Sequence, residues 1–129
     1  LLGTTVTDAG LEHLKKLTSL TSLSLSATQV TNEGLVHIKG LTNLQTLSFS
    51  HSPYTQVSDS GLVHLKSLTN LQTLVLSSTQ VTDAGLAHLK GLTSLKSLFL
   101  SYPQVTDAGV ADLQSALPKC TPLRRPLLQ

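Results

Sequence analysis

The stretch Val81-Thr82-Asp83-Ala84-Gly85 decides the fold, because close copies of it recur along the 129 residues. Its valine recurs in steps of 24, 27, 24 and 24 residues, and a glycine follows each valine by four positions. The marker valines are Val6, Val30, Val57, Val81 and Val105. A period of roughly 20 to 30 residues is typical of a solenoid, in which each unit buries its apolar side only against its neighbours. The sequence therefore predicts one stacked array of about five units over residues 1–129.

Two leucine spacings alternate within each unit. The segment Leu71-x-x-Leu74-x-Leu76 ends in an inside–outside alternation, which predicts a short half-buried strand. After the glycine, Leu86, Leu89 and Leu92 lie three residues apart, which predicts a short helix with one buried side. Hydroxyl residues are predicted to cap these helices: Thr7, Thr31, Ser58, Thr82 and Thr106. The aspartates that follow four of them would face the positive end of the helix dipole, so most acids are predicted to be structural.

The combined pattern, Leu-x-x-Leu-x-x-Leu-x-Leu-x-x-Thr-x-Val, resembles the leucine-rich repeat family, in register from about Leu1 to Val105. The Thr-Asp-x-Gly-Leu variant is similar to 24-residue repeats of bacterial multidomain proteins and to cysteine-containing repeats attached to F-box domains. The resemblance implies a right-handed α/β solenoid, with a parallel sheet on the concave side and short helices on the convex side. It also implies a binding role, most often toward another protein.

The threonines after the strands are a departure from that family, which commonly places asparagine or cysteine there. This sequence has Thr28, Thr55, Thr79 and Pro103 at these positions. A threonine hydroxyl can still bond a nearby backbone group, but proline cannot.

Both ends of the sequence also depart from the repeat. Leu1 takes the place that Leu25 has in the next unit, so the array begins partway through a unit and its N-terminal cap is predicted to be missing. At the other end one residue is inserted before Leu117, and prolines at 118, 122 and 126 are predicted to stop regular pairing in a closing segment of about residues 110–129. We therefore expect either a C-terminal piece of a larger protein or a chain that lacks its first units. Its open ends would allow end-to-end self-association.

Composition narrows the choice of partner and leaves the compartment open. The net charge of +2 is too small to argue for a nucleic-acid or membrane partner. No apolar run approaches the roughly 20 residues of a membrane span, and no signal segment is apparent. The single cysteine, Cys120, excludes an intrachain disulfide and is compatible with a reducing compartment.

No residue pattern predicts catalysis, a cofactor or a metal site. Serines, histidines and aspartates exist in several copies along the array, so no copy of a catalytic group is distinguished. Four histidines form a column along the predicted helices: His13, His37, His64 and His88. A zinc site needs three or four ligands that converge on one point, whereas a column spreads them one per unit. Cys120 occupies a leucine position and is predicted to be a buried apolar residue.

The predicted binding site lies where the repeat is interrupted. Outward strand positions carry hydroxyls except at Val75 and Phe99, which should lie on neighbouring strands. The three extra residues of the 27-residue step fall near His51 and Tyr54. The full set of predicted partner-binding residues is His51, Tyr54, Val75, Ser77, Phe99, Ser101 and Tyr102. Aromatic anchors among small polar groups are typical of protein-binding hot spots.

Two other functions are compatible with the sequence. The array could be a structural spacer that only sets distance within a longer repeat protein. The serine-rich floor could instead bind a sugar or another regular array of hydroxyls.

Overall fold

The computed structural model describes residues 7–25, 28–49, 56–76, 80–101 and 105–125. Within these ranges five strands form one parallel sheet in chain order. They are β1 (Ser22–Ser24), β2 (Thr46–Ser48), β3 (Thr73–Val75), β4 (Ser97–Ser101) and β5 (Thr121–Arg125). The predicted α/β solenoid with one strand per unit is therefore confirmed.

Helical segments alternate with the strands, and all but the last are short. The α-helices are α1 (Asp8–Leu11), α2 (Asp59–Leu62), α3 (Asp83–Leu86) and α4 (Asp107–Ala116). The 3₁₀ segments are η1 (Glu12–Leu14), η2 (Asn32–His37), η3 (Val63–Leu65) and η4 (Ala87–Leu89). Leucines three apart favour a 3₁₀ turn, because residues i and i+3 lie directly above one another there. The inserted residue spaces Leu113 and Leu117 four apart, and α4 remains α-helical throughout.

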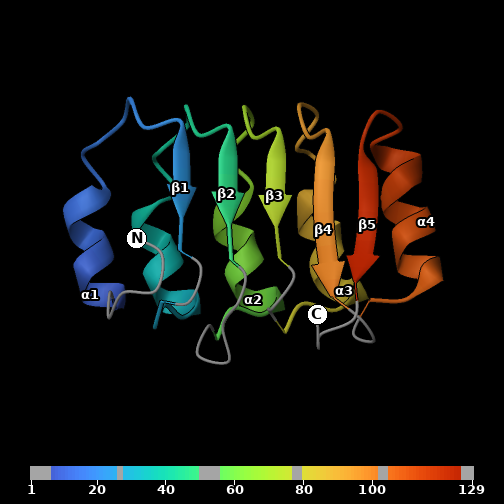
Figure 1. The fold of residues 1–129 in the computed structure, drawn as a ribbon, viewed down its shortest axis with the longest axis horizontal. Helices are drawn as coiled ribbons and strands as arrows, with labels where there is room; N and C mark the ends of the chain where they lie inside the picture. Colours follow the sequence, from blue (N-terminus) through green and yellow to red (C-terminus); the bar gives the residue numbers. More distant parts are fainter. Residues whose placement is uncertain (1–6, 26–27, 50–55, 77–79, 102–104, 126–129) are drawn as a thin grey trace.

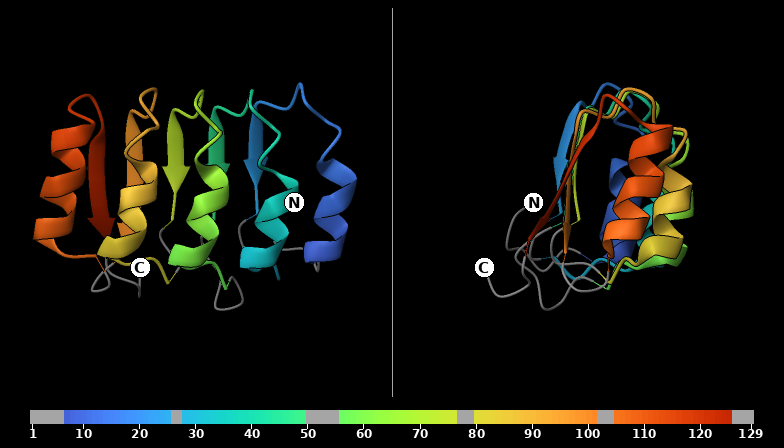
Figure 2. Two further views of the ribbon diagram at one scale, coloured as in Figure 1. Left: turned by 180° about the vertical axis from the view of Figure 1, so that it is seen from behind. Right: turned by 90° about the vertical axis from the view of Figure 1, so that its right-hand side faces the viewer.

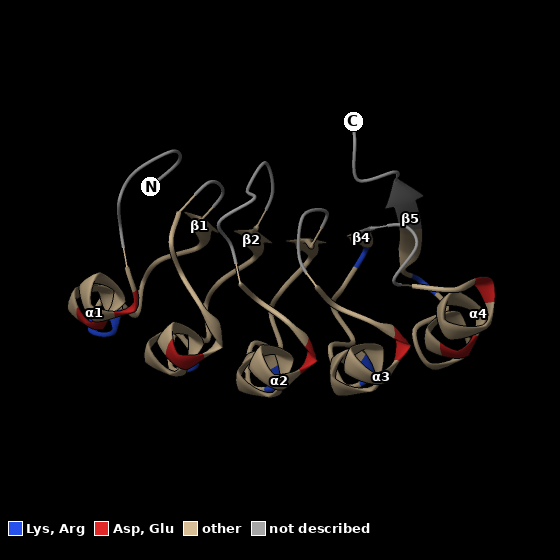
Figure 3. Cartoon of the chain, turned by 90° about the horizontal axis from the view of Figure 1, so that it is seen from below, with Lys and Arg blue, Asp and Glu red and all other residues tan. Residues whose placement is uncertain are grey.

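The helices and the sheet form two layers that curve together. Figure 1 shows each strand running downward in front, while the chain returns upward through the helix behind and steps to the right. This winding is right-handed, as is usual for parallel crossovers. The views from behind and from the side place all helices on one face of the sheet (Figure 2). Seen from below, the helices follow the outer arc and the strands the inner arc, so the sheet lines the concave side (Figure 3).

The core lies between the two layers and consists mainly of leucine. Leu47, Leu74 and Leu98 occupy matching strand positions and are fully buried, as is Phe49. Among the described residues the one buried polar side chain is Thr28, whose hydroxyl donates to the carbonyl of Leu25 at 2.7 Å. The expected local bond at this threonine is confirmed. The equivalent positions 55, 79 and 103 lie outside the described residues.

Neighbouring units are joined by a recurring pair of hydrogen bonds, which we call the aspartate clasp. In one junction the amide of Thr82 donates to Asp59 Oδ1 at 2.7 Å, and the Thr82 hydroxyl donates to Asp59 Oδ2 at 2.5 Å. Asp83 holds Thr106 in the same way. Asp8 does so for Thr31. Three aspartates of the repeated motif therefore bond the hydroxyl residue of the next unit.

One junction uses an amide in place of the carboxylate. The amide of Ser58 donates to Asn32 Oδ1 at 2.9 Å, and Asn32 Nδ2 donates to the Ser58 hydroxyl at 2.8 Å. The side-chain bond is therefore reversed, while the main-chain bond keeps its direction. The clasp depends on an oxygen at this position more than on a negative charge.

The predicted helix caps are right in position but mostly wrong in mechanism. Thr7, Thr31, Ser58 and Thr82 precede their helices but make no side-chain cap bond. At three of them the hydroxyl instead bonds the preceding unit. Only Thr106 also accepts an N-terminal amide of its own helix, from Gly109 at 3.2 Å.

The repeated glycines are required by the same clasp. A Cβ placed at Gly85 would lie 2.2 Å from Asp59 Oδ1. At Gly109 the corresponding distance to Asp83 Oδ1 would be 2.1 Å, and at Gly61 the distance to Asn32 Oδ1 would be 2.3 Å. The three residues of the Thr-Asp-x-Gly motif thus act together. The aspartate reaches across the junction, the threonine of the next unit donates two hydrogen bonds to it, and the glycine of that unit leaves room for its carboxylate.

The C-terminal end corrects a second expectation. The sequence predicts that Pro122 stops regular pairing, but this proline lies within β5 and pairs in register with Leu98. A proline is tolerated in an edge strand, where a missing amide costs no ladder bond on the open side. The turn before β5 is held by Gln114, whose Nε2 donates to the carbonyls of Leu117 at 3.1 Å and Cys120 at 2.7 Å.

Candidate functional site

The concave face of the sheet is a regular surface set by strand register. One row of paired residues carries only hydroxyls: Ser22, Thr46, Thr73, Ser97 and Thr121. The next row begins with Ser24 and Ser48 and continues with Val75 and Phe99. The face therefore changes from polar to apolar along the second row, toward the C-terminal end of the sheet.

Val75 and Phe99 form the apolar part of this face, and we call them the Val75–Phe99 pair. They are directly paired in the register of β3 and β4, as the sequence predicted. Both side chains are half-buried. Their backbone is fixed, since the amide of Leu76 donates to the carbonyl of Phe99 at 2.8 Å and that of Phe49 to Val75 at 2.7 Å. On the other side of Phe99, the register places Leu123 of β5.

The remaining predicted site residues cannot be added to this geometry. His51, Tyr54, Ser77 and Tyr102 lie outside the described residues. Ser101 is the last residue of β4 and pairs in register with Arg125. Of the seven predicted residues, the structure thus brings together Val75 and Phe99 on the sheet, with Ser101 two residues further along the same strand.

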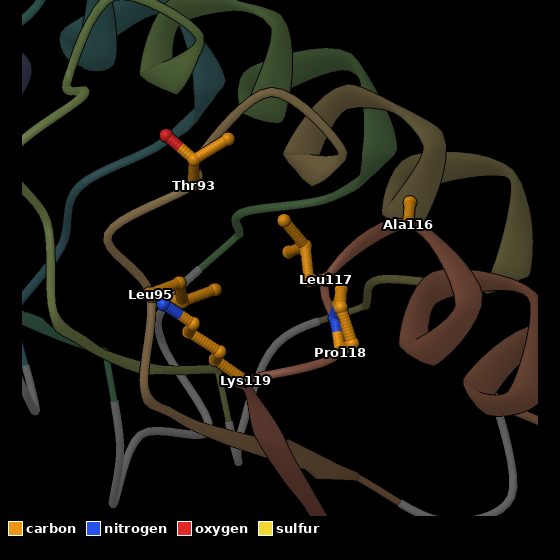
Figure 4. Close-up of a pocket in the computed structure, with 6 residues that line it drawn as sticks. All are labelled: Thr93, Leu95, Ala116, Leu117, Pro118 and Lys119. Atoms are coloured by element: carbon orange, nitrogen blue, oxygen red, sulfur yellow. The ribbon is translucent and has the colours of Figure 1, made fainter.

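Sequence reasoning missed a depression beside the segments that lead into β4 and β5, near the C-terminal end of the array. It has a volume of about 230 Å³. Figure 4 shows its lining residues: Thr93 and Leu95 from the segment before β4, and Ala116, Leu117, Pro118 and Lys119 from the turn after α4. A second hollow of about 520 Å³ lies beside it and includes Thr121 of the hydroxyl row. The inserted residue of the last unit was the available signal, because it lengthens the segment that forms one wall.

The histidine column is spread over the convex side, as the repeat predicts. His13, His37, His64 and His88 lie on four successive helical segments. In the part of the chain that the structure describes, no three histidine, cysteine, aspartate or glutamate residues come together as metal ligands would. Asp112 takes the column's place in the last unit, where it pairs with Lys90 at 2.7 Å.

Cys120 is buried, and it occupies a leucine position of the frame. Burial raises the pKa of its thiol above the ordinary value. A thiol that stays protonated is a weak nucleophile. We therefore expect a thiol-specific reagent at pH 8 to label native Cys120 at least about a hundredfold more slowly than the urea-unfolded chain.

The exposed neighbour Lys119 provides the control for this measurement. A chain carrying Cys120→Ala and Lys119→Cys should react at nearly the same rate before and after unfolding. Equal labelling rates for native and unfolded Cys120 would show that the thiol is accessible to the reagent and is therefore not buried in the core.

No helix within the described ranges has the length and apolar character needed to cross a membrane.

Comparison with known proteins agrees with this architecture. A family model described as leucine-rich repeats in two copies matches residues 69–119, and a model of a single leucine-rich repeat matches residues 16–38. The chain belongs to the leucine-rich repeat family. A search of curated protein sequences gave no significant match.

Solved structures with a similar fold include two internalins of Listeria monocytogenes. The internalin inlF is 29% identical with a TM-score of 0.70, and the match covers 88% of this chain and 30% of that one. Internalin C2 is 28% identical with a TM-score of 0.69, covering 89% and 47%. A leucine-rich repeat protein of Leptospira interrogans, 24% identical with a TM-score of 0.64 over 86% and 27%, shares the fold. This chain thus spans less than half the length of each.

Proposed function

We propose that the chain is a non-catalytic interaction module that binds a protein partner through the concave face and its adjacent loops. Leucine-rich repeat proteins are generally binding modules without catalytic activity, and the similarity to internalins supports this role. The observation that carries the proposal is the Val75–Phe99 pair, which replaces the serines that the same row carries in β1 and β2.

Phe99 combines a rigid backbone with a polar surround. Phe99 lies in a strand whose backbone is paired on both sides, so little backbone freedom is lost when a partner covers it. The neighbouring hydroxyls can both donate and accept hydrogen bonds, which lets them pair with a partner's polar groups around an apolar centre. An aromatic anchor with a polar surround is the arrangement in which a few residues supply most of the binding energy.

The proposed contact surface includes both strand and loop residues. Val75, Phe99 and Ser101 belong to the sheet, while His51, Tyr54, Ser77 and Tyr102 follow strands in the sequence and lie outside the described residues. In this proposal the loops widen the surface on the side of the strand ends, and the Val75–Phe99 pair forms its centre.

The decisive variant is Phe99→Ser, and it should abolish partner capture while leaving the fold intact. Serine already occupies the two register positions of the same row in β1 and β2, so the sheet accepts it. Loss of a central aromatic anchor should weaken binding by at least about 2 kcal/mol, or about thirtyfold in Kd. Affinity capture from source lysate by the wild-type chain and the variant, with mass spectrometry, measures the effect.

Ser22→Ala is the matched control, because Ser22 is exposed on the same face at the far end of the sheet. A partner retained by the wild type and by Ser22→Ala but lost by Phe99→Ser would support the proposal. Thermal unfolding followed by circular dichroism verifies that both variants are folded. Capture of the same proteins by all three chains would contradict a site centred on Phe99.

A spacer role is the second candidate, and the coverage of the structural neighbours favours it. The chain corresponds to 27–47% of the length of those proteins, so a comparable array can form part of a longer one. In that role the concave face would be passive, and Phe99→Ser would leave every interaction of the protein unchanged.

A further inference from the structure

Asparagine side chains bridge neighbouring units on the edge of the array where the chain leads into the strands. Asn43 Nδ2 donates to the carbonyl of Thr18 in the unit before it at 2.8 Å. Asn70 Nδ2 donates to the carbonyl of Thr42 in the same way at 2.9 Å. At these two junctions the side chain therefore covers the step between units and gives a main-chain carbonyl its donor.

These bridges stop before the C-terminal end. Ser94 and Lys119 occupy the asparagine positions of the last two units, and in the described part of the chain neither side chain bonds the preceding unit. The carbonyl of Thr93 therefore lacks the side-chain donor that its counterparts receive. The depression and the hollow described above lie at this junction, since Thr93, Leu95 and Lys119 line both of them.

The depression is largely apolar. Leu95, Ala116, Leu117 and Pro118 supply carbon to its walls, and the Lys119 side chain extends past them toward Leu95 (Figure 4). A closed apolar cavity of about 150 Å³ is enough to hold benzene. The depression, with its volume of about 230 Å³, therefore has room for one branched or aromatic side chain.

The adjoining hollow is polar and positively charged. Lys96 and Lys119 line it, both are exposed, and neither forms an ion pair with a described residue. No aspartate or glutamate is found among its described lining residues. Gln72, Ser94 and Thr121 add uncharged groups that can donate hydrogen bonds. A carboxylate placed here would gain two cationic neighbours and meet no opposing charge.

We propose that the depression and the hollow together bind the last residue of a peptide chain that ends in an apolar side chain and a free carboxylate. The carboxylate lies between Lys96 and Lys119. The side chain enters the depression against Leu95 and Leu117, and the N–H of the residue donates to the carbonyl of Thr93.

The last residue of a peptide carries these three groups side by side, just as the depression and the hollow share one wall. A fatty acid lacks the amide donor, and an inorganic anion lacks the apolar group. Neither Val75 nor Phe99 lines the depression or the hollow, so this site goes beyond the proposed concave contact. A negative result here would therefore leave the proposal for Phe99 standing.

The test uses the hexapeptide Gly-Ser-Gly-Ser-Gly-Leu with a free C-terminus, added to the isotope-labelled full chain and followed by NMR. We expect saturable amide shifts at residues 93–96 and 119–121, with a Kd below about 1 mM. Three matched peptides each lack one group: a C-terminal amide lacks the charge, a terminal serine lacks the apolar side chain, and an N-methylated last peptide bond lacks the donor. Each should bind at least about fivefold more weakly.

Three results would overturn the proposal. They are an absence of shifts at these residues, equal binding of the free acid and its amide, and binding of octanoate as tight as that of the hexapeptide. The last of these would assign the site to fatty acids.

A paired substitution locates the carboxylate. The Lys96→Gln, Lys119→Gln double variant keeps most of each side chain and should bind the hexapeptide at least about fivefold more weakly. Lys39→Gln with Lys66→Gln is the matched control, because both lysines are exposed, neither lines the site, and the change in net charge is the same. The amide spectrum verifies that both variants are folded. Equal weakening in the two double variants would mean a general effect of charge and would contradict a carboxylate site at Lys96 and Lys119.

Discussion

Gly85→Ala is expected to lower the free energy of unfolding by about 2–4 kcal/mol. The new Cβ would lie 2.2 Å from Asp59 Oδ1 and 3.1 Å from the Cδ1 methyl of Leu62. The carboxylate could move away, but only by giving up its two bonds to Thr82. Hydrogen bonds to a charged group contribute about 1.5–3 kcal/mol each, so either the clash or the broken clasp is costly. Urea denaturation followed by circular dichroism measures the loss.

Gly91→Ala is the matched control for that substitution. A Cβ at Gly91 would meet nothing within 4 Å, and the φ of Gly91 lies outside the left-handed region. Alanine should therefore fit, and the lower entropy of the unfolded chain should leave stability unchanged or raise it by up to about 1 kcal/mol. If both alanines had the same effect, the crowding at Gly85 would not be the cause.

Asp59→Ala is expected to lower the free energy of unfolding by about 2–3 kcal/mol, because it leaves the amide of half-buried Thr82 without its acceptor. Asp59→Asn should cost less than about 1 kcal/mol. The chain itself supports this difference, since Asn32 forms the equivalent clasp to Ser58 with a carboxamide. Urea denaturation of the two variants provides the comparison. A loss as large for asparagine as for alanine would mean that charge, rather than the hydrogen-bonding oxygen, stabilises the junction.

The two substitutions should be strongly coupled. In an Asp59→Ala background the carboxylate that crowds Gly85 is gone, and alanine is favoured over glycine in a helix by about 1 kcal/mol. Gly85→Ala should then be nearly neutral or stabilising, although it is costly in the wild-type chain. Additive losses in the double variant would show that Asp59 and Gly85 act independently, and would contradict a shared role of the two residues in the clasp.

The layers of the fold could be predicted from the sequence because they depend on spacing. Leucines such as Leu74 and Leu89 report burial through their period, and burial decides strand and helix. The register follows from the 24-residue step, which is why the pairing of Val75 with Phe99 could be predicted from the sequence alone. The burial of Cys120 could be predicted for the same reason, since it occupies a leucine position.

Contacts between units could not be predicted in the same way. Asp59 precedes its own helix, so a local interpretation assigns it to the helix dipole. Its actual partner, Thr82, is 23 residues away and becomes adjacent only after the units stack. The glycine requirement is hidden for the same reason, since the atom that excludes a side chain at Gly85 belongs to the preceding unit. Periodicity shows that a residue recurs, but not which unit it contacts.

The longest step of the repeat has a consequence for how this surface can change. Asn32 and Ser58 are separated by 26 positions instead of 23, yet their clasp is intact and β2 still pairs with β3 in register. The junction therefore tolerates added chain length between a strand and the next clasp. Such a position allows new sequence to be acquired, by evolution or by design, without loss of the underlying stack, so recognition can diversify while the architecture is inherited unchanged.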